Sequence, residues 1–346
     1  MPKAQELADR VERHISGGGT AKQVRELVLA DLRRALPFEG HVFMLTDPVT
    51  RIATSPLADL PGLPWPRLPE LIRARYLTPI NRWDALLGSA ARSLLEATDG
   101  EPERSLVWRE VQRGLGVIDT ATVTFGDRYG CWGFLELVRT AWPPFTSAEL
   151  SELTALIKPV TAGLREALGR TFAAPDARLP PVGPAVLILD PQLRVRSQTA
   201  AAAAALLRLN PPDEPMPPIP NSVYNVGAAL IATEQQCPIG SPWSRINLGG
   251  NRFVTVKADR IGGGDIAVSI EPSTPAERLD LFARAHALTA RETEVLSLLA
   301  AGFDSRHMAT EMTISEHTVN DHVKGVLAKC TARTRNALLS RVLGSA

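Results

Sequence analysis

Near the C-terminus, polar side chains recur along one side of a predicted helix. They fall at positions i, i+3, i+4 and i+7 and are His317, Asn320, Asp321 and Lys324. This spacing places all four on one helix face. Imidazole, amide, carboxylate and ammonium groups can meet base edges in the major groove of DNA. A carboxylate is repelled by phosphates but accepts from cytosine N4, so Asp321 favours base contact over plain charge attraction.

Basic residues follow this face directly. From Val323 to the C-terminus the chain carries no acid and five cationic side chains, namely Lys324, Lys329, Arg333, Arg335 and Arg341. A local positive patch can bind a polyanion even though the whole chain has a net charge of only +1. We therefore predict phosphate contacts at Lys329, Arg333 and Arg335. On charge alone, an ordinary solvated helix face remains the alternative.

The elements that would position these side chains are short helices with clear boundaries. Val319, Val323 and Val326 form an apolar face opposite the polar one. Thr289 and Glu292 form a capping box that opens an earlier helix, which Gly302 ends; Asp304 or Ser305 caps the next helix, and Ser315 caps the one that carries the polar face. Two helices joined by so tight a turn indicate a helix-turn-helix.

The segment Leu288–Arg335 resembles the LuxR-type DNA-binding domain. It has the opening LTARETEVL, the helix end AAG, the entry ISEHTVNDHV and a late LAK followed by arginine. The resemblance implies a four-helix domain whose third helix reads the major groove and whose fourth, Thr334–Val342, often dimerises. It implies base contacts at Asn320, Asp321 and Lys324, and phosphate contacts at Ser315, Thr318, Lys329 and Arg335. Cys330-Thr331 departs from the usual leucine and small residue, but a buried thiol can pack as a small hydrophobe.

Proline-rich segments divide the rest of the chain. Its 346 residues, 45% hydrophobic and 22% charged, are typical of a globular protein with two or three domains. Thr171–Ala185 and Asn210–Pro220 are rich in proline and are predicted to be a linker and a loop. A softer boundary lies at Glu271–Pro275, before a helix predicted over Ala276–Ala287.

Two segments of mixed periodicity precede that helix. In the first, we predict helices over Lys22–Leu36, Leu68–Leu77, Trp83–Ala97, Glu103–Arg113 and Ser147–Arg170, and strands over His41–Thr46, Arg51–Thr54, Ala121–Phe125 and Cys131–Val138. In the second, we predict strands over Val186–Leu189, Arg194–Ser197, Ile246–Leu248, Phe253–Lys257 and Ile266–Ile270, and helices over Ala200–Leu209 and Val223–Thr233. Both patterns indicate α+β domains with antiparallel sheets.

The first segment, with VIDTATVTFGDRYGCWGFLELVR before a long helix, resembles a GAF sensor domain, and the second, opening AVLILDPQLRVRSQTAAAAALL, is similar to a PAS-like domain. The predicted fold is therefore multidomain, with two α+β sensor-like domains before an all-α four-helix LuxR-type helix-turn-helix domain. The boundaries are a GAF-like domain over residues 1–170, a proline-rich linker over 171–184, a PAS-like domain over 185–272, a connecting helix over 273–287 and the DNA-binding domain over 288–346.

The chain lacks the sequence signatures of several other kinds of protein. There is no GxxxxGK[ST] for ATP hydrolysis, no GxSxG or HExxH for hydrolysis, and Asp47 lacks the acidic cluster of a phosphorylated receiver. Cys131, Cys237 and Cys330 are too dispersed to indicate a disulfide framework or a thiolate zinc site. No apolar stretch approaches the ~18 residues of a membrane span. We expect no enzyme activity, no metal, no cofactor and no membrane association.

These observations predict a cytoplasmic, sequence-specific transcription regulator. Its expected partners are double-stranded DNA, a second copy of the chain in a homodimer, and an unidentified small-molecule ligand of the sensor region. A ligand that prefers one sensor conformation would change how the connecting helix presents the DNA-binding domain. The alternative is a ligand-sensing or scaffold protein whose helical domain binds protein instead of DNA. An enzyme built on the GAF-like fold is a more remote one.

Overall fold

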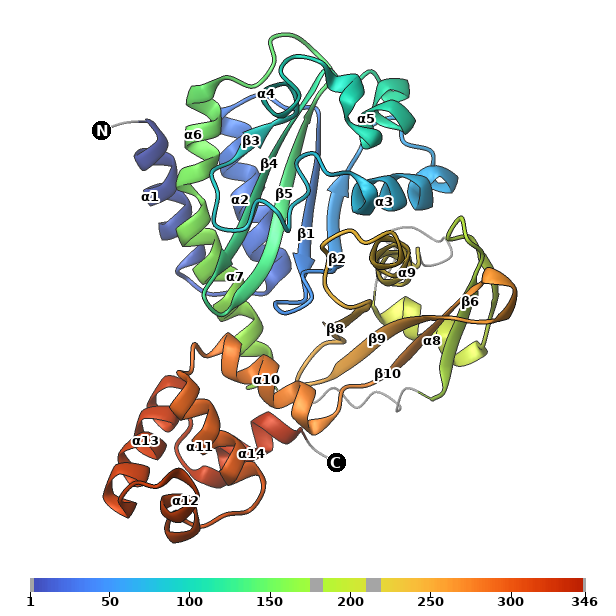
Figure 1. Cartoon of the computed structure of the whole chain (residues 1–346). Coiled ribbons are helices and arrows are strands. Elements are labelled where there is room, and N and C mark those ends of the chain that lie inside the picture. Colours follow the sequence, from blue (N-terminus) through green and yellow to red (C-terminus); the bar gives the residue numbers. More distant parts are fainter. Residues whose placement is uncertain (1–2, 175–182, 210–218, 345–346) are drawn as a thin grey trace. The chain divides into compact units, whose positions relative to one another are not determined.

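The structure is a computed structural model that describes residues 3–174, 183–209 and 219–344 (Figure 1). The chain divides into two compact units. The larger comprises the described parts of 1–167, 181–246 and 255–271, and the smaller those of 168–180, 247–254 and 272–346. Most of both proline-rich segments predicted as linker and loop lies outside the described residues.

The first sheet of the larger unit has the strand order β2-β1-β5-β4-β3, with antiparallel pairing throughout. Its strands are β1 (Gly40–Thr46), β2 (Ala53–Asp59), β3 (Arg92–Ser93), β4 (Asp119–Asp127) and β5 (Gly130–Arg139). The helices are α1 (Lys3–Ile15), α2 (Ala21–Ala35), α3 (Leu68–Leu77), α4 (Leu94–Ala97), α5 (Leu106–Glu110), α6 (Ser147–Ala155) and α7 (Ile157–Thr171). Figure 1 shows α1, α2 and α6 stacked on one side of this sheet and α3 on the other.

Two predicted helices of the first segment are wrong. The stretch Trp83–Ala97 is mostly turn, followed by β3 and the single turn α4. Within it, Gly88 has a left-handed backbone at φ 80°, which interrupts a helix. Trp83 is 1% exposed, and its indole donates to the carbonyl of Arg51 at 2.8 Å, so tertiary contacts decide this stretch.

The helix predicted over Glu103–Arg113 is likewise broken. Its place is taken by a 3-10 turn at Pro102–Arg104, the short α5 and a second 3-10 turn at Gln112–Leu115. A new helix, α5, begins here with Ser105 as its N-cap. The indole of Trp108 donates to the carbonyl of Val117 at 2.9 Å, an anchor that periodicity does not reveal.

Other boundaries in the first segment moved by a few residues. The strand predicted over Arg51–Thr54 is β2, which continues to Asp59 and tolerates Pro56 because it lies at the edge of the sheet. The long helix predicted over Ser147–Arg170 is two helices that meet at Leu156. The helix predicted over Lys22–Leu36 is confirmed as α2, with its capping box at Thr20 and Gln23.

The second sheet repeats the topology of the first. Its order is β7-β6-β10-β9-β8, so the five strands of each sheet are arranged second, first, fifth, fourth and third along the chain. The elements are β6 (Ala185–Leu189), β7 (Val195–Gln198), α8 (Ala200–Leu209), α9 (Asn221–Glu234), β8 (Trp243–Asn247), β9 (Phe253–Arg260) and β10 (Ile266–Pro272). All the predicted elements of this segment are present, and α9 packs against α3 and β2 of the first sheet domain.

The smaller unit is built from the C-terminal helices. These are α10 (Pro275–Ala285), α11 (Ala290–Ala300), α12 (Ser305–Met312), α13 (Glu316–Lys329) and α14 (Arg335–Leu343). The predicted caps are confirmed, with Asp304 rather than Ser305 capping α12. Burial raises the pKa of the Cys330 thiol to about 12, in keeping with a side chain that packs as a hydrophobe.

The core of this unit extends beyond the C-terminal domain. Phe282 of α10 contacts Phe172, which in turn stacks on Phe253 with ring centroids 4.6 Å apart. Arg278 of α10 is 6% exposed and donates from Nε to the carbonyl of Val342 at 3.0 Å and from Nη2 to Oδ1 of Asn251 at 2.7 Å. The end of α14, the helix α10 and the turn before β9 are thus tied together.

Candidate nucleic-acid interface

The helix α13 presents its predicted polar face to solvent. Val319, Val323 and Val326 are at most 3% exposed and fix the opposite face in the core. The side chains of His317, Asp321 and Lys324 are 86%, 53% and 75% exposed. Three of the four predicted base contacts therefore lie where a major groove could meet them.

These three side chains form a chain of charges along α13. Asp321 lies 3.4 Å from Nε2 of His317 through Oδ2 and 3.2 Å from Nζ of Lys324 through Oδ1. Exposed pairs of this kind contribute at most about 1 kcal/mol. Breaking these two ion pairs therefore costs little free energy, so His317, Asp321 and Lys324 can contact groups on DNA instead.

The fourth predicted base contact, Asn320, is only half-buried and is held from two sides. Its Oδ1 accepts from Ser305 of α12 at 2.9 Å and from Nη2 of Arg335 at 3.0 Å. Arg335, predicted from the sequence to meet phosphate, thus has at least one nitrogen turned toward the domain. No residue spacing predicts this contact, and Ser305 was expected only as an alternative cap for α12.

The first turn of α13 holds two further predicted phosphate contacts. The hydroxyl of Ser315 accepts from the backbone N–H of Thr318 at 3.1 Å, and the two hydroxyls lie 2.9 Å apart. Ser315 is exposed and Thr318 is half-buried. A helix N-terminus carries partial positive charge and unpaired N–H groups, so this turn is suited to a phosphate.

Of the remaining predicted phosphate contacts, Arg333 is exposed, whereas Lys329 is paired within the domain. Nζ of Lys329 lies 2.7 Å from Oε2 of Glu292, the acid of the α11 capping box. Burial alone raises the pKa of Glu292, but hydrogen bonds from Lys329 and Thr289 outweigh it and lower the pKa below its ordinary value. Glu292 therefore joins α11 to the end of α13.

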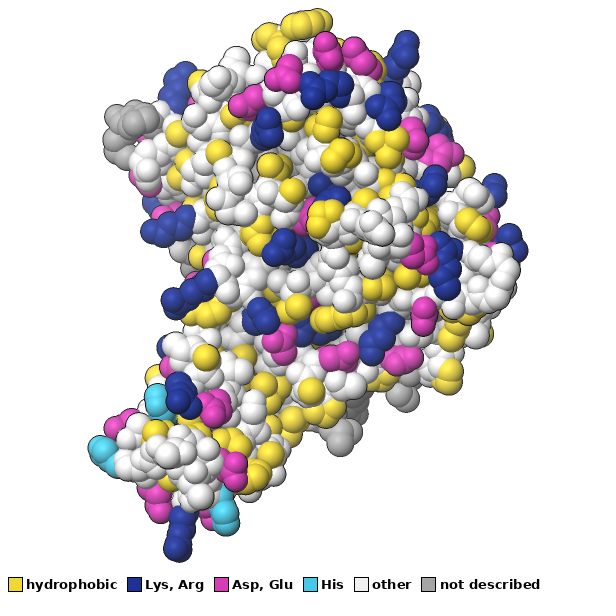
Figure 2. All heavy atoms as spheres, in the orientation of Figure 1, with side chains coloured by type: hydrophobic (Ala, Val, Ile, Leu, Met, Phe, Trp, Pro, Cys, Tyr) yellow, Lys and Arg dark blue, Asp and Glu magenta, His cyan; other side chains and the backbone are white. Residues whose placement is uncertain are grey.

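The surface over these helices is mixed in sign. In Figure 2 the part of the molecule formed by the C-terminal helices carries basic, acidic and histidine side chains close together, and all the histidines visible from this side lie there. A mixed surface favours selective pairing with base edges over uniform attraction to phosphate.

The helix α14 buries most of the surface predicted for a partner. Leu338 and Val342 are fully buried, and Leu339 is partly buried against the same core. Leu343 is 39% exposed. Of Leu338, Leu339 and Val342, Leu339 alone keeps exposed surface, and homodimerisation stays a prediction.

A second candidate site lies in the larger unit, on the side of the first sheet that faces α3. A cavity of about 660 Å³ opens there, within the range of small-molecule sites. Its lining is mostly apolar and comes from β1, β2, β5 and α3, with α9 of the second sheet domain supplying polar groups; the lining includes Met44, Leu71, Arg75, Trp83, Phe134 and Asn225. Two sheet domains thus share one cavity.

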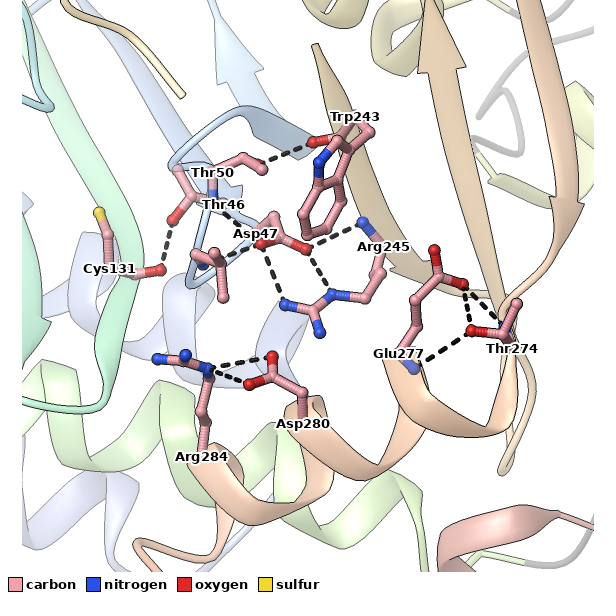
Figure 3. A network of polar contacts seen from close by, with 11 residues as sticks. Thr46, Asp47, Thr50, Cys131, Trp243, Arg245, Thr274, Glu277, Asp280 and Arg284 are labelled. Atoms are coloured by element: carbon pink, nitrogen blue, oxygen red, sulfur yellow. Dashed lines mark hydrogen bonds and ion pairs between the residues drawn. The ribbon is translucent and has the colours of Figure 1, made fainter. Parts of the chain in front are cut away.

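The same two domains are joined by a buried ion pair (Figure 3). Nε of Arg245 in β8 lies 2.8 Å from Oδ2 of Asp47, which follows β1, and Nη2 lies 3.2 Å from Oδ1. The two side chains are 1% and 0% exposed. Beside them, the hydroxyl of Thr50 donates to the carbonyl of Trp243 at 2.8 Å. Asp47 therefore holds the two sheets together.

Comparison with known proteins identifies the C-terminal domain. The family described as "Bacterial regulatory proteins, luxR family" matches residues 286–342. Transcriptional regulatory protein DesR of Bacillus subtilis (strain 168) is 36% identical over 62 residues, which are 18% of this chain and 31% of DesR. The chain thus spans about a third of the length of this relative. The C-terminal region is a LuxR-type helix-turn-helix domain of the kind found in bacterial regulatory proteins.

Two solved structures resemble the whole chain weakly. One, "SdiA in complex with octanoyl-rac-glycerol", has a TM-score of 0.37 at 14% identity and covers 96% of this chain and 92% of its own. The other, Escherichia coli SdiA in the space group P6522, has a TM-score of 0.30 at 14% identity and covers 99% and 96%.

Two negative findings apply to the part of the chain that the structure describes. No helix there is both long and apolar enough to cross a membrane. Nor do three or more His, Cys, Asp or Glu side chains gather there in a way that could hold a metal ion.

Proposed function

We propose that this protein is a sequence-specific transcription regulator that reads double-stranded DNA with α13. The observation that carries the proposal is the solvent-facing row of His317, Asp321 and Lys324 on the second helix of a LuxR-type helix-turn-helix. A major groove about 12 Å wide admits one α-helix. In this arrangement α13 lies in the groove, with these three residues and Asn320 at base edges.

Phosphate contacts would surround the helix. Ser315 and Thr318 lie at its positive N-terminus, and Arg333 is exposed beyond its C-terminus. Lys329 would have to leave Glu292, and Arg335 has further N–H groups besides the one that Asn320 accepts. These contacts would fix the register of the domain on DNA without carrying sequence information.

We further propose that the first two domains act as GAF-like and PAS-like sensors that modulate this reader. The cavity that both line could hold a small-molecule ligand, which would favour one arrangement of the two. The helix α10 follows β10 directly and is bound to the end of α14 through Arg278. A change in the sheet domains would reach the reader along this helix. The protein would act in the cytoplasm as a homodimer.

Selection of bound DNA from a random pool, using the full chain, tests DNA reading. We expect a defined sequence, with affinity that falls steeply as salt is raised because counterions are released on binding. Replacing His317, Asp321 and Lys324 together by alanine should abolish the selection. A matched control replaces the exposed pair Arg291 and Glu294 of α11 by alanine and should leave it intact. A helical domain that binds protein instead would select no sequence.

A second arm of the same selection tests modulation. Adding a metabolite extract from the source cells should change the affinity of the full chain for the selected sequence. A bulky substitution in the cavity, Met44→Trp, should remove that response while basal binding persists. If the extract and the substitution both leave affinity unchanged, the sensor proposal fails and the reader proposal stands.

A further inference from the structure

Asn320 differs from its neighbours on α13 because two other helices hold its side chain. Ser305 is the first residue of α12, and Arg335 is the first residue of α14. Nη2 of Arg335 lies 3.0 Å from Oδ1 of Asn320 and 2.9 Å from Oγ of Ser305, and Oγ of Ser305 lies 2.9 Å from Oδ1 of Asn320. The three side chains close a small ring of hydrogen bonds where three helices meet.

This ring fixes which way the carboxamide of Asn320 points. A guanidinium only donates hydrogen bonds, so the Asn320 atom that faces Arg335 must be the oxygen. The hydroxyl of Ser305 accepts from Arg335 and can give its own proton to the same oxygen. Both acceptor positions of Oδ1 are then used within the domain. Its amide nitrogen, with two N–H donors, is the part left for a ligand.

We propose that Asn320 is a specificity-determining residue that reads a hydrogen-bond acceptor on a base edge through Nδ2. Ser305 and Arg335 are the positioning residues that set this polarity. The inference rests on the proposed DNA reading by α13 and says what one position of that reader prefers.

The polarity has a consequence for base choice. A free asparagine pairs with adenine by donating to N7 and accepting from N6, which requires an available Oδ1. With Oδ1 already engaged, adenine loses this advantage. Guanine presents two adjacent acceptors, O6 and N7, and suits an amide that only donates. We therefore expect guanine at the base pair that Asn320 meets.

The first test compares sequences selected from a random pool by full-chain variants. Asn320→Asp keeps an oxygen for Arg335 but removes the donor, so guanine should lose about tenfold in relative affinity at one position of each half-site. Arg335→Met removes the group that holds Oδ1, so adenine should become accepted at that same position, whereas Ser305→Ala keeps the contact with Arg335 and should shift the preference less. Arg333→Met, a neighbouring exposed arginine, is the matched control and should weaken all sequences alike.

A second test changes the DNA and leaves the protein intact. Placing 7-deazaguanine at the preferred position removes the N7 acceptor, and wild type should bind it several-fold more weakly. Asn320→Asp should be indifferent to the same replacement. Circular dichroism of each variant checks that the domain is folded. If Arg335→Met is unfolded, the binding of wild type and Asn320→Asp to the 7-deazaguanine duplex tests the inference without it.

The outcomes separate this inference from the function on which it rests. If wild type selects a sequence but no position responds to Asn320→Asp or 7-deazaguanine, the inference is overturned and DNA reading stands. If Arg335→Met only weakens all sequences as Arg333→Met does, Arg335 is a phosphate contact and not a positioning residue. If wild type selects no sequence, both proposals fail.

Discussion

Lys324 is an exposed lysine on the face of α13 proposed to read bases. Its ammonium group forms an exposed ion pair with Asp321, so Lys324→Ala removes a surface group and should not affect folding. If it meets a base, the variant should lose about 1–3 kcal/mol of binding and relax preference at one or two positions. Binding isotherms on the selected sequence and on single-base variants check this. A loss equal on every sequence would assign Lys324 to phosphate.

Glu292 gives stability a dependence on acid pH. Its lowered pKa means that ionised Glu292 contributes fully above the unfolded value of about 4.3 and that this contribution is lost as pH falls through the lower folded pKa. Lys329→Met should raise the pKa of Glu292 and remove the contribution. The difference in melting temperature between wild type and Lys329→Met should therefore be largest above about pH 5 and should narrow below about pH 4.

The exposed Arg333→Met is the control for this pH series. Arg333 lies in the same segment but is exposed, and the partner of Glu292 is Lys329. The difference in melting temperature between wild type and Arg333→Met should therefore not narrow at low pH. A difference between wild type and Lys329→Met that stays constant from pH 3 to 7 would mean that the pair with Glu292 contributes nothing through ionisation.

At the scale of the element, α14 is the candidate for dimerisation. Two linked readers gain affinity through effective concentration, and we expect an inverted repeat with half-sites about 10 bp apart. Leu339→Arg should lower affinity for the full site and leave half-site binding nearly unchanged. Because Leu339 is partly buried against the core, we also expect a loss of about 1 kcal/mol in the free energy of unfolding.

Leu343→Arg is the companion variant, because Leu343 is more exposed and its replacement should cost little stability. Fluorescence anisotropy with half-site and full-site duplexes measures both variants. Equal affinity of wild type for the two duplexes would rule out the dimer.

The helix α10 determines how well the C-terminal DNA-binding domain folds when it is separated from the rest of the chain. A fragment of residues 274–346 retains the caps and apolar core of α11–α14, so it should fold and bind DNA weakly. It lacks Phe172, which contacts Phe282, together with Phe253, which stacks on Phe172, and Asn251, which accepts from Arg278. We therefore expect it to unfold at a lower urea concentration than the same helices in the full chain. A random-coil circular dichroism spectrum would show that the reader depends on the upstream chain.

At the scale of the whole molecule, the Asp47–Arg245 pair tests whether the two sheet domains unfold together. Removing one partner of a buried ion pair leaves the other uncompensated, so Asp47→Ala should cost about 3–5 kcal/mol. Replacing both residues by leucine removes the uncompensated charge but also removes the acceptor of the backbone N–H groups of Val49, Thr50 and Arg245, so it should recover only part of that loss. Calorimetry of the single and double variants measures the coupling. Two separate transitions for the sheet domains in wild type would contradict a single cooperative unit.

Local signals in the sequence determined the reader. Capping residues act on N–H groups three positions away, and helical periodicity repeats within two turns. Thr289 with Glu292, the cap Ser315 and the opposed faces of α13 could therefore be predicted, as could the LuxR-type pattern over the same residues. The strands of the second sheet domain were equally clear, because alternation and turn residues are also local.

Only the tertiary structure decided which polar side chains are paired with one another inside the protein. Lys329 pairs with Glu292, which lies 37 positions away in the sequence, and Asp47 pairs with Arg245, which lies 198 positions away. The turn of Asn320 toward Arg335 depends on how three helices pack, and no spacing rule encodes it. The false helix over Trp83–Ala97 has the same cause, because Trp83 is anchored to Arg51 and not to its own helical turn. Local patterns fix faces and ends of elements, whereas pairing between distant side chains follows from packing alone.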